Sequence, residues 1–460
     1  MFSNQAAELS VNRPVAAVDA VRGDRVNSKF LAGTSSVRES EDNHLLLLRF
    51  HTDANQLGID ARLSHPTGPV GCIRTSPADP SYVLTTAENN PSEATLWKIP
   101  PESIDSVPAD LDSDGGDDND HDGYNYGHDE SPSANYGGAG SDGASAMEER
   151  AVLRGSASSG ASARLTDLAW RGAAWDDGDP STESTMGDVA TLCSDGTLTQ
   201  WDVAFGSAES TRSCAADLSS PLRPGLPPRM AWDPHHPDLT AVSSGEAVTL
   251  VDWREPPSAP SLGSSGRPHH RYGITDLDFN PNKPNLLVTS GRDGLLKFWD
   301  LRNTGSGFFD ADSGGGQEIV AGGSAGRTKK QRPLLVARGG HRHWATRVRY
   351  NPFHDQLVLS AGTDSLVNLW RMSTISSAPL LTFDDGSAED GESLPQGQHQ
   401  NQHQNTQEGP NVRVSRYEHM DSIHALAWGA SDAWIYLSAS YDGKVVLNHV
   451  PSKEKYKILL

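Results

Sequence analysis

The stretch His270–Asp300, HRYGITDLDFNPNKPNLLVTSGRDGLLKFWD, carries the pattern that decides the fold. Two later stretches repeat it: HRHWATRVRYNPFHDQLVLSAGTDSLVNLW begins at His341, and HMDSIHALAWGASDAWIYLSASYDGKVVLN begins at His419. In each copy an Asp follows the His by 23 residues, and an aromatic residue follows it by nine. Turn signals such as Asp293-Gly294 separate short runs with alternating apolar positions, which predicts strands of about four to eight residues.

A repeat of about 40–45 residues with four short strands and a closing Trp-Asp is typical of a β-propeller blade. One such blade has two apolar faces and cannot bury both of them alone. A ring of blades buries these faces and leaves only short, protected strand edges. The sequence therefore predicts an all-β propeller of WD repeats.

The repeats resemble the WD-repeat family, and this resemblance implies a hydrogen-bonded chain of His, Ser or Thr, Asp and Trp inside each blade. A buried Asp is costly alone, but the other members of such a set satisfy it. Two sets are complete, and the third has Asn448 where Trp belongs. The residues implied are His270, Thr289, Asp293 and Trp299; His341, Ser360, Asp364 and Trp370; and His419, Ser438 and Asp442.

Weaker copies of the template bring the predicted number of blades to seven. We expect them near residues 30–50, 70–100, 164–202, 228–254, 270–302, 341–371 and 419–450, within a propeller that spans residues 30–460. Residues 1–29 form a separate N-terminal segment that is a candidate source of a closing strand. Two segments are candidates for this strand, Val15–Val21 and the tail Tyr456–Leu460. Three stretches without periodicity, residues 101–163, 304–335 and 376–411, are predicted to be disordered inserts between blades.

The chain is acidic, with a formal net charge of −22, but much of this charge is local. Residues 101–150 hold fourteen Asp and Glu and one Arg, so the other residues carry only −9. Binding to nucleic acid needs clustered Lys and Arg, and the balance argues against it. The three cysteines form no CxxC pair, and no apolar run reaches the length of a signal peptide or a membrane span. We therefore expect a cytosolic or nuclear protein without direct membrane insertion.

The histidines do not lie in a catalytic pattern. No HExxH, GxSxG, P-loop or kinase signature occurs. Asp110, Asp112, Asp114 and Gly115 match the start of a calcium-binding loop, but His121 stands where the bidentate Glu is required. The sequence therefore predicts neither an enzyme nor a bound metal or cofactor.

The C-terminal half carries a sharper resemblance. DLDFNPNKPNLLVTSGRDGLLKFWDLRN from Asp276, YEHMDSIHALAWGASDAWIYLSASYDGKVVLNHVP from Tyr417 and the terminal KYKILL resemble the family of EARP- and GARP-interacting WD-repeat proteins. This resemblance implies a scaffold or adaptor that associates with two tethering complexes, the endosome-associated recycling complex and the Golgi-associated retrograde complex. It implies roles in endosomal recycling, retrograde transport to the trans-Golgi network and dense-core vesicle maturation, with a location at the trans-Golgi network and endosomes. The acidic, Gly-rich and Gln-rich inserts depart from the family pattern.

In WD repeats the loop that carries each His and the turn that carries each Asp lie on the same face. Trp, Tyr and Arg often anchor interfaces, so the residues beside those positions are candidate partner contacts. They are Tyr272, Arg292, Trp344, Thr363, Met420 and Tyr441.

Two other functions are alternatives. Trp299, Asp300 and Arg302 match the WDxR box of propellers that act as substrate receptors of cullin–RING ubiquitin ligases. The acidic insert and the basic run Arg327–Arg332 suggest instead a histone-binding chromatin propeller.

Overall fold

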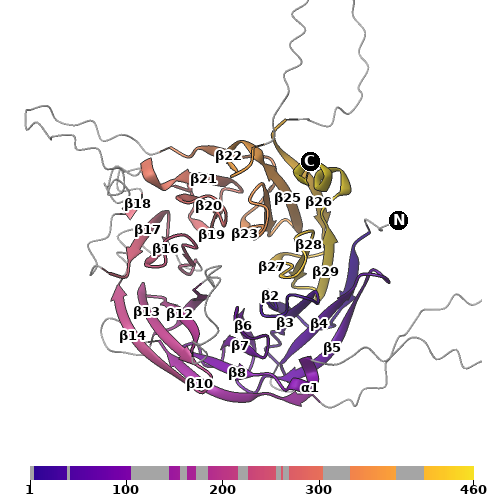
Figure 1. Ribbon diagram of the computed structural model, residues 1–460, viewed down its shortest axis with the longest axis vertical. Helices are drawn as coiled ribbons and strands as arrows, with labels where there is room; N and C mark the ends of the chain where they lie inside the picture. The colour runs from indigo at the N-terminus through magenta and orange to yellow at the C-terminus, as the bar shows by residue number, and fades with distance from the viewer. Residues whose placement is uncertain are drawn as a thin grey trace, which may run out of the picture.

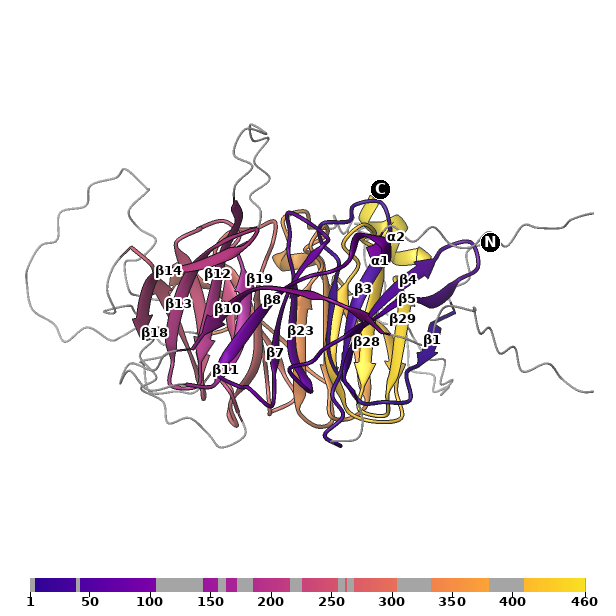
Figure 2. The same ribbon diagram turned by 90° about the horizontal axis from the view of Figure 1, so that it is seen from below.

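The computed structural model describes residues 5–38, 42–104, 144–155, 163–171, 185–215, 226–254, 261–262, 269–303, 332–379 and 409–459. The strands within these ranges form seven sheets arranged around a central axis (Figure 1). Seen from the side, the strands run through the thickness of a disc (Figure 2). The predicted all-β, seven-bladed propeller is therefore confirmed.

The strands of each blade are hydrogen-bonded in the order below, beginning with the strand nearest the axis (Figure 1). Blade 1 contains β2 (Val15–Ala20), β3 (Lys29–Thr34), β4 (His44–His51), β5 (Gln56–Ser64) and the short β9 (Ser145–Ala146). Blade 2 contains β6 (Val70–Thr75), β7 (Tyr82–Ala87), β8 (Glu93–Lys98) and β10 (Glu148–Arg154). Blade 3 contains β11 (Leu165–Trp170), β12 (Thr185–Cys193), β13 (Thr197–Ala204) and β14 (Ser207–Ala215). Blade 4 contains β15 (Met230–Trp232), β16 (Leu239–Ser244), β17 (Ala247–Asp252) and β18 (Ser261–Leu262).

The last three blades carry the repeats that decided the fold. Blade 5 contains β19 (Ile274–Phe279), β20 (Leu286–Gly291), β21 (Leu296–Asp300) and β22 (Leu335–Ala337). Blade 6 contains β23 (Ala345–Tyr350), β24 (Leu357–Gly362), β25 (Leu366–Met372) and β26 (Asn411–Glu418). Blade 7 contains β27 (Ile423–Trp428), β28 (Ile435–Ser440), β29 (Lys444–His449) and β1 (Ala7–Ser10). The helical segments are α1 (Pro101–Ile104), η1 (Leu301–Asn303), η3 (Ser373–Ile375) and α2 (Ser452–Leu459).

The core lies between neighbouring blades. The middle strands are apolar on both sides, as in β20 and β24, where every residue is buried. Val288 and Phe298 of blade 5, for example, pack with Val348, Tyr350 and Trp370 of blade 6. Because each sheet buries both faces against its neighbours, the ring as a whole supplies the core that a single blade lacks.

The ring closes through a strand that neither candidate segment supplies. Residues Ala7–Ser10 form β1, which pairs antiparallel with β29 as the outer strand of blade 7. The N-terminal segment 1–29 thus supplies the closing strand, as expected, but from Ala7–Ser10 and from neither of the two stretches named for it. Val15–Ala20 is the buried inner strand of blade 1, where its apolar residues are needed. Residues 456–459 of the tail belong to helix α2, in which Glu454 forms a buried ion pair with Arg371 of blade 6.

Two boundaries also need correction. Blade 1 begins at Val15 and holds four main strands, so residues 1–29 are not separate from the propeller, and the two strands expected in residues 30–50 are only its middle part. The insert 101–163 is not entirely a loop, because Glu148–Arg154 forms β10, which pairs with β8 as the outer strand of blade 2. Most of the three inserts, including residues 105–143, 304–331 and 380–408, lies outside the described residues.

Within the described ranges, no helix combines the length and the apolar character needed to cross a membrane.

Candidate protein-interaction face

The four residues implied for blade 5, His270, Thr289, Asp293 and Trp299, form one hydrogen-bonded chain, which we call a tetrad. His270 Nδ1 lies 2.7 Å from Asp293 Oδ1, and His270 Nε2 lies 2.8 Å from Thr289 Oγ1. Trp299 Nε1 donates to the same Thr289 hydroxyl oxygen at 2.9 Å. An indole N–H can only donate, so the Thr289 hydroxyl proton is free for His270 Nε2, and His270 Nδ1 donates to Asp293. The chain therefore satisfies every one of these side chains within the blade.

The electrostatics fit a neutral His and an ionised Asp. Burial lowers the pKa of His270 below its ordinary value, despite the opposing effect of Asp293. Burial would raise the pKa of Asp293, but the hydrogen bond from His270 and the nearby Lys297 lower it to about 2. Lys297 Nζ lies 3.2 Å from Asp293 Oδ2. Asp293 is thus ionised at neutral pH and accepts hydrogen bonds from His270 and Lys297.

Blade 6 repeats this chain. His341 Nδ1 lies 3.0 Å from Asp364 Oδ1, and His341 Nε2 lies 2.8 Å from Ser360 Oγ. Trp370 Nε1 donates to Ser360 Oγ at 2.9 Å. In both blades, therefore, buried side chains hold the loop that carries the His against the turn that carries the Asp.

Blade 7 differs, and one residue explains why. His419 Nε2 lies 2.8 Å from Ser438 Oγ, but His419 Nδ1 lies 3.1 Å from Ser440 Oγ, which in turn donates to Asp442. The position of Ser440 is a glycine in the other two repeats, Gly291 and Gly362. A Cβ at either glycine would collide with the His ring. In blade 7 the serine side chain occupies this space and relays the bond between His and Asp.

Blade 2 holds a related set that the sequence pattern did not reveal. His65 Nε2 lies 2.9 Å from Thr85 Oγ1, to which Trp97 Nε1 donates at 2.9 Å. The carbonyl oxygen of Gly68 takes the place of the Asp and lies 2.7 Å from His65 Nδ1. The missing Asp and a spacing of 12 residues between Thr85 and Trp97, against 10 between Thr289 and Trp299, concealed this set. Trp97, which was expected to end this blade, was the one residue of the set that the sequence pattern indicated.

We expect Asp293→Ala to destabilise the protein by about 1–3 kcal/mol, because His270 and Lys297 would lose a buried acceptor. Thermal and urea unfolding at neutral pH would measure this change. Asp421→Ala is a suitable control, since Asp421 lies in an exposed loop of the same face and bonds only to the adjacent Ser422 amide among the contacts described. If the Asp293→Ala variant unfolds at the same temperature and urea concentration as the parent protein, the hydrogen-bonded set does not stabilise the blade.

The loops fixed by these chains share one face, which we call the tetrad face. In each of blades 5, 6 and 7, the turn that carries the Asp donates a backbone N–H to the loop that carries the His. These bonds join Arg292 to Gly273, Thr363 to Trp344 and Tyr441 to Ser422. Neighbouring blades are also linked here, because Ser422 Oγ donates to the Thr363 carbonyl oxygen at 3.3 Å.

Arginine and aromatic side chains gather on the tetrad face between blades 5 and 6. Arg292 Cζ lies 4.4 Å from the centre of the Trp344 indole, and His343 stacks against the same indole at 5.0 Å. A hollow of about 320 Å³ opens here. We call its lining the arginine–aromatic patch, which consists of Tyr272, Arg292, Asp293, Arg342, His343 and Trp344.

Of the six candidate contacts, the structure places Tyr272, Arg292 and Trp344 in this patch. Thr363 borders it, because its hydroxyl lies 2.5 Å from His343 Nδ1. Met420 and Tyr441 are exposed on blade 7 but do not line the hollow. The candidates therefore divide into a connected patch and two separate side chains.

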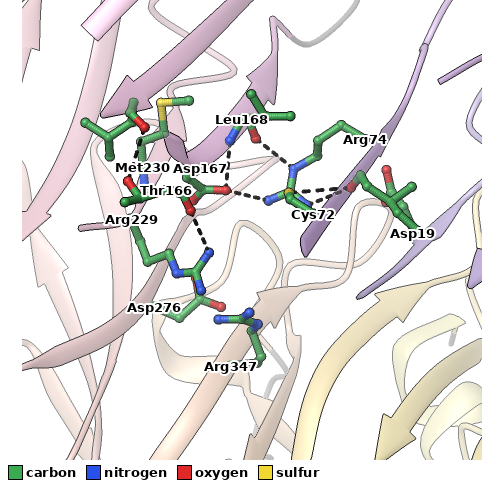
Figure 3. Close-up of polar contacts among 12 residues, drawn as sticks. Asp19, Cys72, Arg74, Thr166, Asp167, Leu168, Arg229, Met230, Asp276 and Arg347 are labelled. Carbon is green, nitrogen blue, oxygen red and sulfur yellow. Dashed lines mark hydrogen bonds and ion pairs between the residues drawn. The ribbon is translucent and has the colours of Figure 1, made fainter. Parts of the chain in front are cut away.

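A second polar cluster lies deep in the propeller, where the inner strands face the axis (Figure 3). Arg74 Nη2 of blade 2 lies 2.9 Å from Asp167 Oδ1 of blade 3, and Arg74 Nε donates to the Leu168 carbonyl oxygen at 2.8 Å. Asp167 Oδ2 also accepts from the Met230 amide of blade 4 at 3.1 Å. One carboxylate thus links three blades, and we assign this cluster to the stability of the ring.

The same pattern recurs across the ring. Asp276 Oδ2 of blade 5 lies 2.7 Å from Arg349 Nη1 of blade 6 and accepts from the Val348 amide at 3.1 Å. The sequence pattern did not reveal these residues, because each inner strand contributes only one or two charged residues. The pairing of an Asp with an Arg of the next blade appears only when the inner strands are placed side by side. The described residues contain no group of three or more His, Cys, Asp and Glu with a metal-binding arrangement.

The WDxR residues lie at the opposite end of β21 from Asp293. Trp299 is buried in the tetrad, whereas Arg302 is exposed and pairs with Asp300 at 2.7 Å. Arg254 forms the same local pair with Asp252 in blade 4 at 2.8 Å. This arrangement therefore also occurs in a blade that lacks the box.

Comparison with known proteins shows the family to which the chain is related. Residues 264–300 match the family model described as WD domain, G-beta repeat. EARP and GARP complex-interacting protein 1 of Rattus norvegicus is 30% identical over 441 residues, which cover 94% of this chain and 93% of that protein. The chain belongs to the EARP and GARP complex-interacting protein family.

Two further proteins are similar to this chain over nearly the same length. The EARP-interacting protein homolog of Gekko japonicus is 30% identical over 444 residues, 94% of this chain and 93% of that protein. The WD repeat-containing protein DWA2 of Arabidopsis thaliana is 25% identical over 435 residues, 94% of this chain and 92% of that protein. The similarity thus extends over nearly the whole propeller.

Proposed function

We propose that this chain is a non-catalytic scaffold that binds subunits of the EARP and GARP tethering complexes through its tetrad face. The family relationship supports the choice of partner, since relatives are named for interaction with these complexes. The arginine–aromatic patch supports the choice of face. Trp and Arg side chains in a hollow that a partner can desolvate are typical interface anchors.

In cells this scaffold would support endosomal recycling, retrograde transport to the trans-Golgi network and dense-core vesicle maturation. We expect the protein in the cytoplasm, associated with the trans-Golgi network and endosomes. Its partners are proteins, and we propose no role for nucleic acid or for direct insertion into a membrane.

We expect Trp344→Ala to weaken capture of the tethering subunits by about 2 kcal/mol, or roughly thirtyfold, because it removes the indole on which Arg292 and His343 stack. Affinity purification of the tagged full chain with quantitative mass spectrometry would measure the effect. Thermal unfolding of the variant would establish that the fold is kept.

Arg302→Ala is the matched control, because Arg302 is exposed at the opposite end of blade 5. This variant should capture the tethering subunits as well as the parent chain does. If Arg302→Ala instead abolished capture of a cullin–RING adaptor while Trp344→Ala had no effect, the ligase-receptor function would replace the scaffold. Recovery of histones without tethering subunits would favour the chromatin alternative.

A further inference from the structure

The joint between blades 6 and 7 departs from its neighbour at two facing positions. Between blades 5 and 6, Trp370 belongs to the apolar cluster, and Leu335 of β22 packs against it. The strand register places Ser415 of β26 where Leu335 stands, and Asn448 of β29 where Trp370 stands. Two large apolar side chains are thus replaced by two small polar ones.

A cavity occupies this joint. Its volume is about 610 Å³, and its walls include Glu8, Ser415, Tyr417, Tyr436 and Asn448. We call it the seam pocket, because it lies where the closing strand β1 meets blades 6 and 7. Tyr436 stands where Val358 does in blade 6 and fills part of the missing volume. The remaining space is within the range of roughly 300–1,000 Å³ found for ligand pockets.

One wall of the pocket carries a buried donor without an acceptor. Asn448 is 8% exposed, and its Nδ2 has no hydrogen-bond partner among the described residues. A buried amide N–H₂ is costly when unsatisfied, so this group favours an occupant that brings an acceptor. The carboxylate in the pocket wall, Glu8, already has partners: it accepts a hydrogen bond from Tyr417 Oη at 2.6 Å and lies 3.4 Å from Lys444 Nζ.

The pocket also adjoins the end of strand β29 that β1 does not pair with. The ladder between β1 and β29 stops at the pair Ala7 and Leu447, so Asn448 and His449 lie beyond its last residue pair. Beyond that pair the chain turns toward blade 1, where the Gln5 carbonyl oxygen accepts from Asn55 Nδ2 at 3.0 Å. A strand end of this kind offers backbone groups to an extended peptide.

We propose that the seam pocket binds an aromatic side chain of a protein partner, with Asn448 Nδ2 donating to a peptide carbonyl oxygen beside the ring. The aromatic group takes the space that Trp370 fills in the neighbouring joint. Tyr417, which is only partly buried, supplies a ring surface against which it packs. This site is distinct from the tetrad face and does not depend on which complex the tetrad face binds.

N-acetyl-tryptophanamide is a suitable probe, because it joins an indole to two amide carbonyls. Its binding to the full chain can be titrated by ligand-observed NMR, beside free indole and N-acetyl-leucinamide. We expect saturable binding that is at least tenfold tighter than that of either comparison compound. Asn448→Trp and Ser415→Leu each fill the pocket and should each weaken binding at least tenfold, while Tyr456→Ala on the exposed face of α2 should leave it unchanged.

The two filling variants keep the test decisive if one of them fails to fold. Absence of saturable binding to the parent chain would overturn the proposal. So would equal binding of N-acetyl-leucinamide, or retention of binding in a folded filling variant. Free indole that binds as tightly as N-acetyl-tryptophanamide would show a small-molecule site and would contradict recognition of a peptide.

Discussion

Removal of residues 1–10 is expected to lower the free energy of unfolding by roughly 3–5 kcal/mol, at about 1 kcal/mol for each lost ladder hydrogen bond. Four residue pairs join β1 to β29, and the bond between Tyr417 and Glu8 anchors this strand to blade 6. Without β1, the edge of β29 is open and the first and last blades lose the exchanged strand that joins them. Exposed strand edges also promote association, so the truncated chain should aggregate at lower temperature.

Denaturant unfolding and light scattering during heating would measure these changes. Removal of residues 1–4 alone is the matched control, since it leaves β1 intact, and its unfolding should match that of the full chain. A synthetic peptide with residues 1–12 should restore part of the lost stability when added in excess. A chain without residues 1–10 that unfolds like the parent would show that β1 does not close the ring.

Asp167→Ala is the second change with a large expected effect. The Asp167 side chain is 2% exposed, and its carboxylate links Arg74 of blade 2 and the Met230 amide of blade 4 to blade 3. Truncation leaves the Arg74 guanidinium in the interior without its carboxylate, which should cost about 3–5 kcal/mol. Burial acts to raise the pKa of Asp167, but Arg74 and Arg229 keep it below its ordinary value, so the pair is ionised at neutral pH.

Asp188→Ala provides the comparison within the same blade. Asp188 pairs with Arg171 at 2.7 Å, but both side chains are partly exposed, so its loss should cost only about 0–1 kcal/mol. The double variant Arg74→Met with Asp167→Leu should be more stable than Asp167→Ala, because it removes both buried charges. Equal unfolding of Asp167→Ala and Asp188→Ala would contradict the role of the inner cluster.

The fold could be predicted because its signal is local and repeated. The spacing of 23 residues between His and Asp, with Trp at a fixed distance, places a complete set inside one blade, so a single segment carries the information. The difference in blade 7 was less visible. It depends on Ser440 standing where Gly291 and Gly362 leave room for the His ring, and only the geometry shows that the serine relays the bond.

Features that join distant blades could not be found in this way. The strand Ala7–Ser10 alternates apolar and polar residues, but it is only four residues long and its partner lies more than 400 residues away. Arg74 and Asp167 are 93 residues apart, and neither stands in a recognisable motif. The patch at Trp344 was foreseen in part, because WD-repeat geometry indicates which loops share a face but not which of their side chains meet.

Hydrogen–deuterium exchange of the full chain, alone and with purified EARP complex, tests the central claim most directly. If the tetrad face is the docking surface, complex formation should slow exchange at the loops around Tyr272, Arg292 and Trp344. Exchange at the opposite end of blade 5, near Arg302, should not change. Protection near Arg302 with unchanged exchange around Trp344, or no complex at all, would contradict the account.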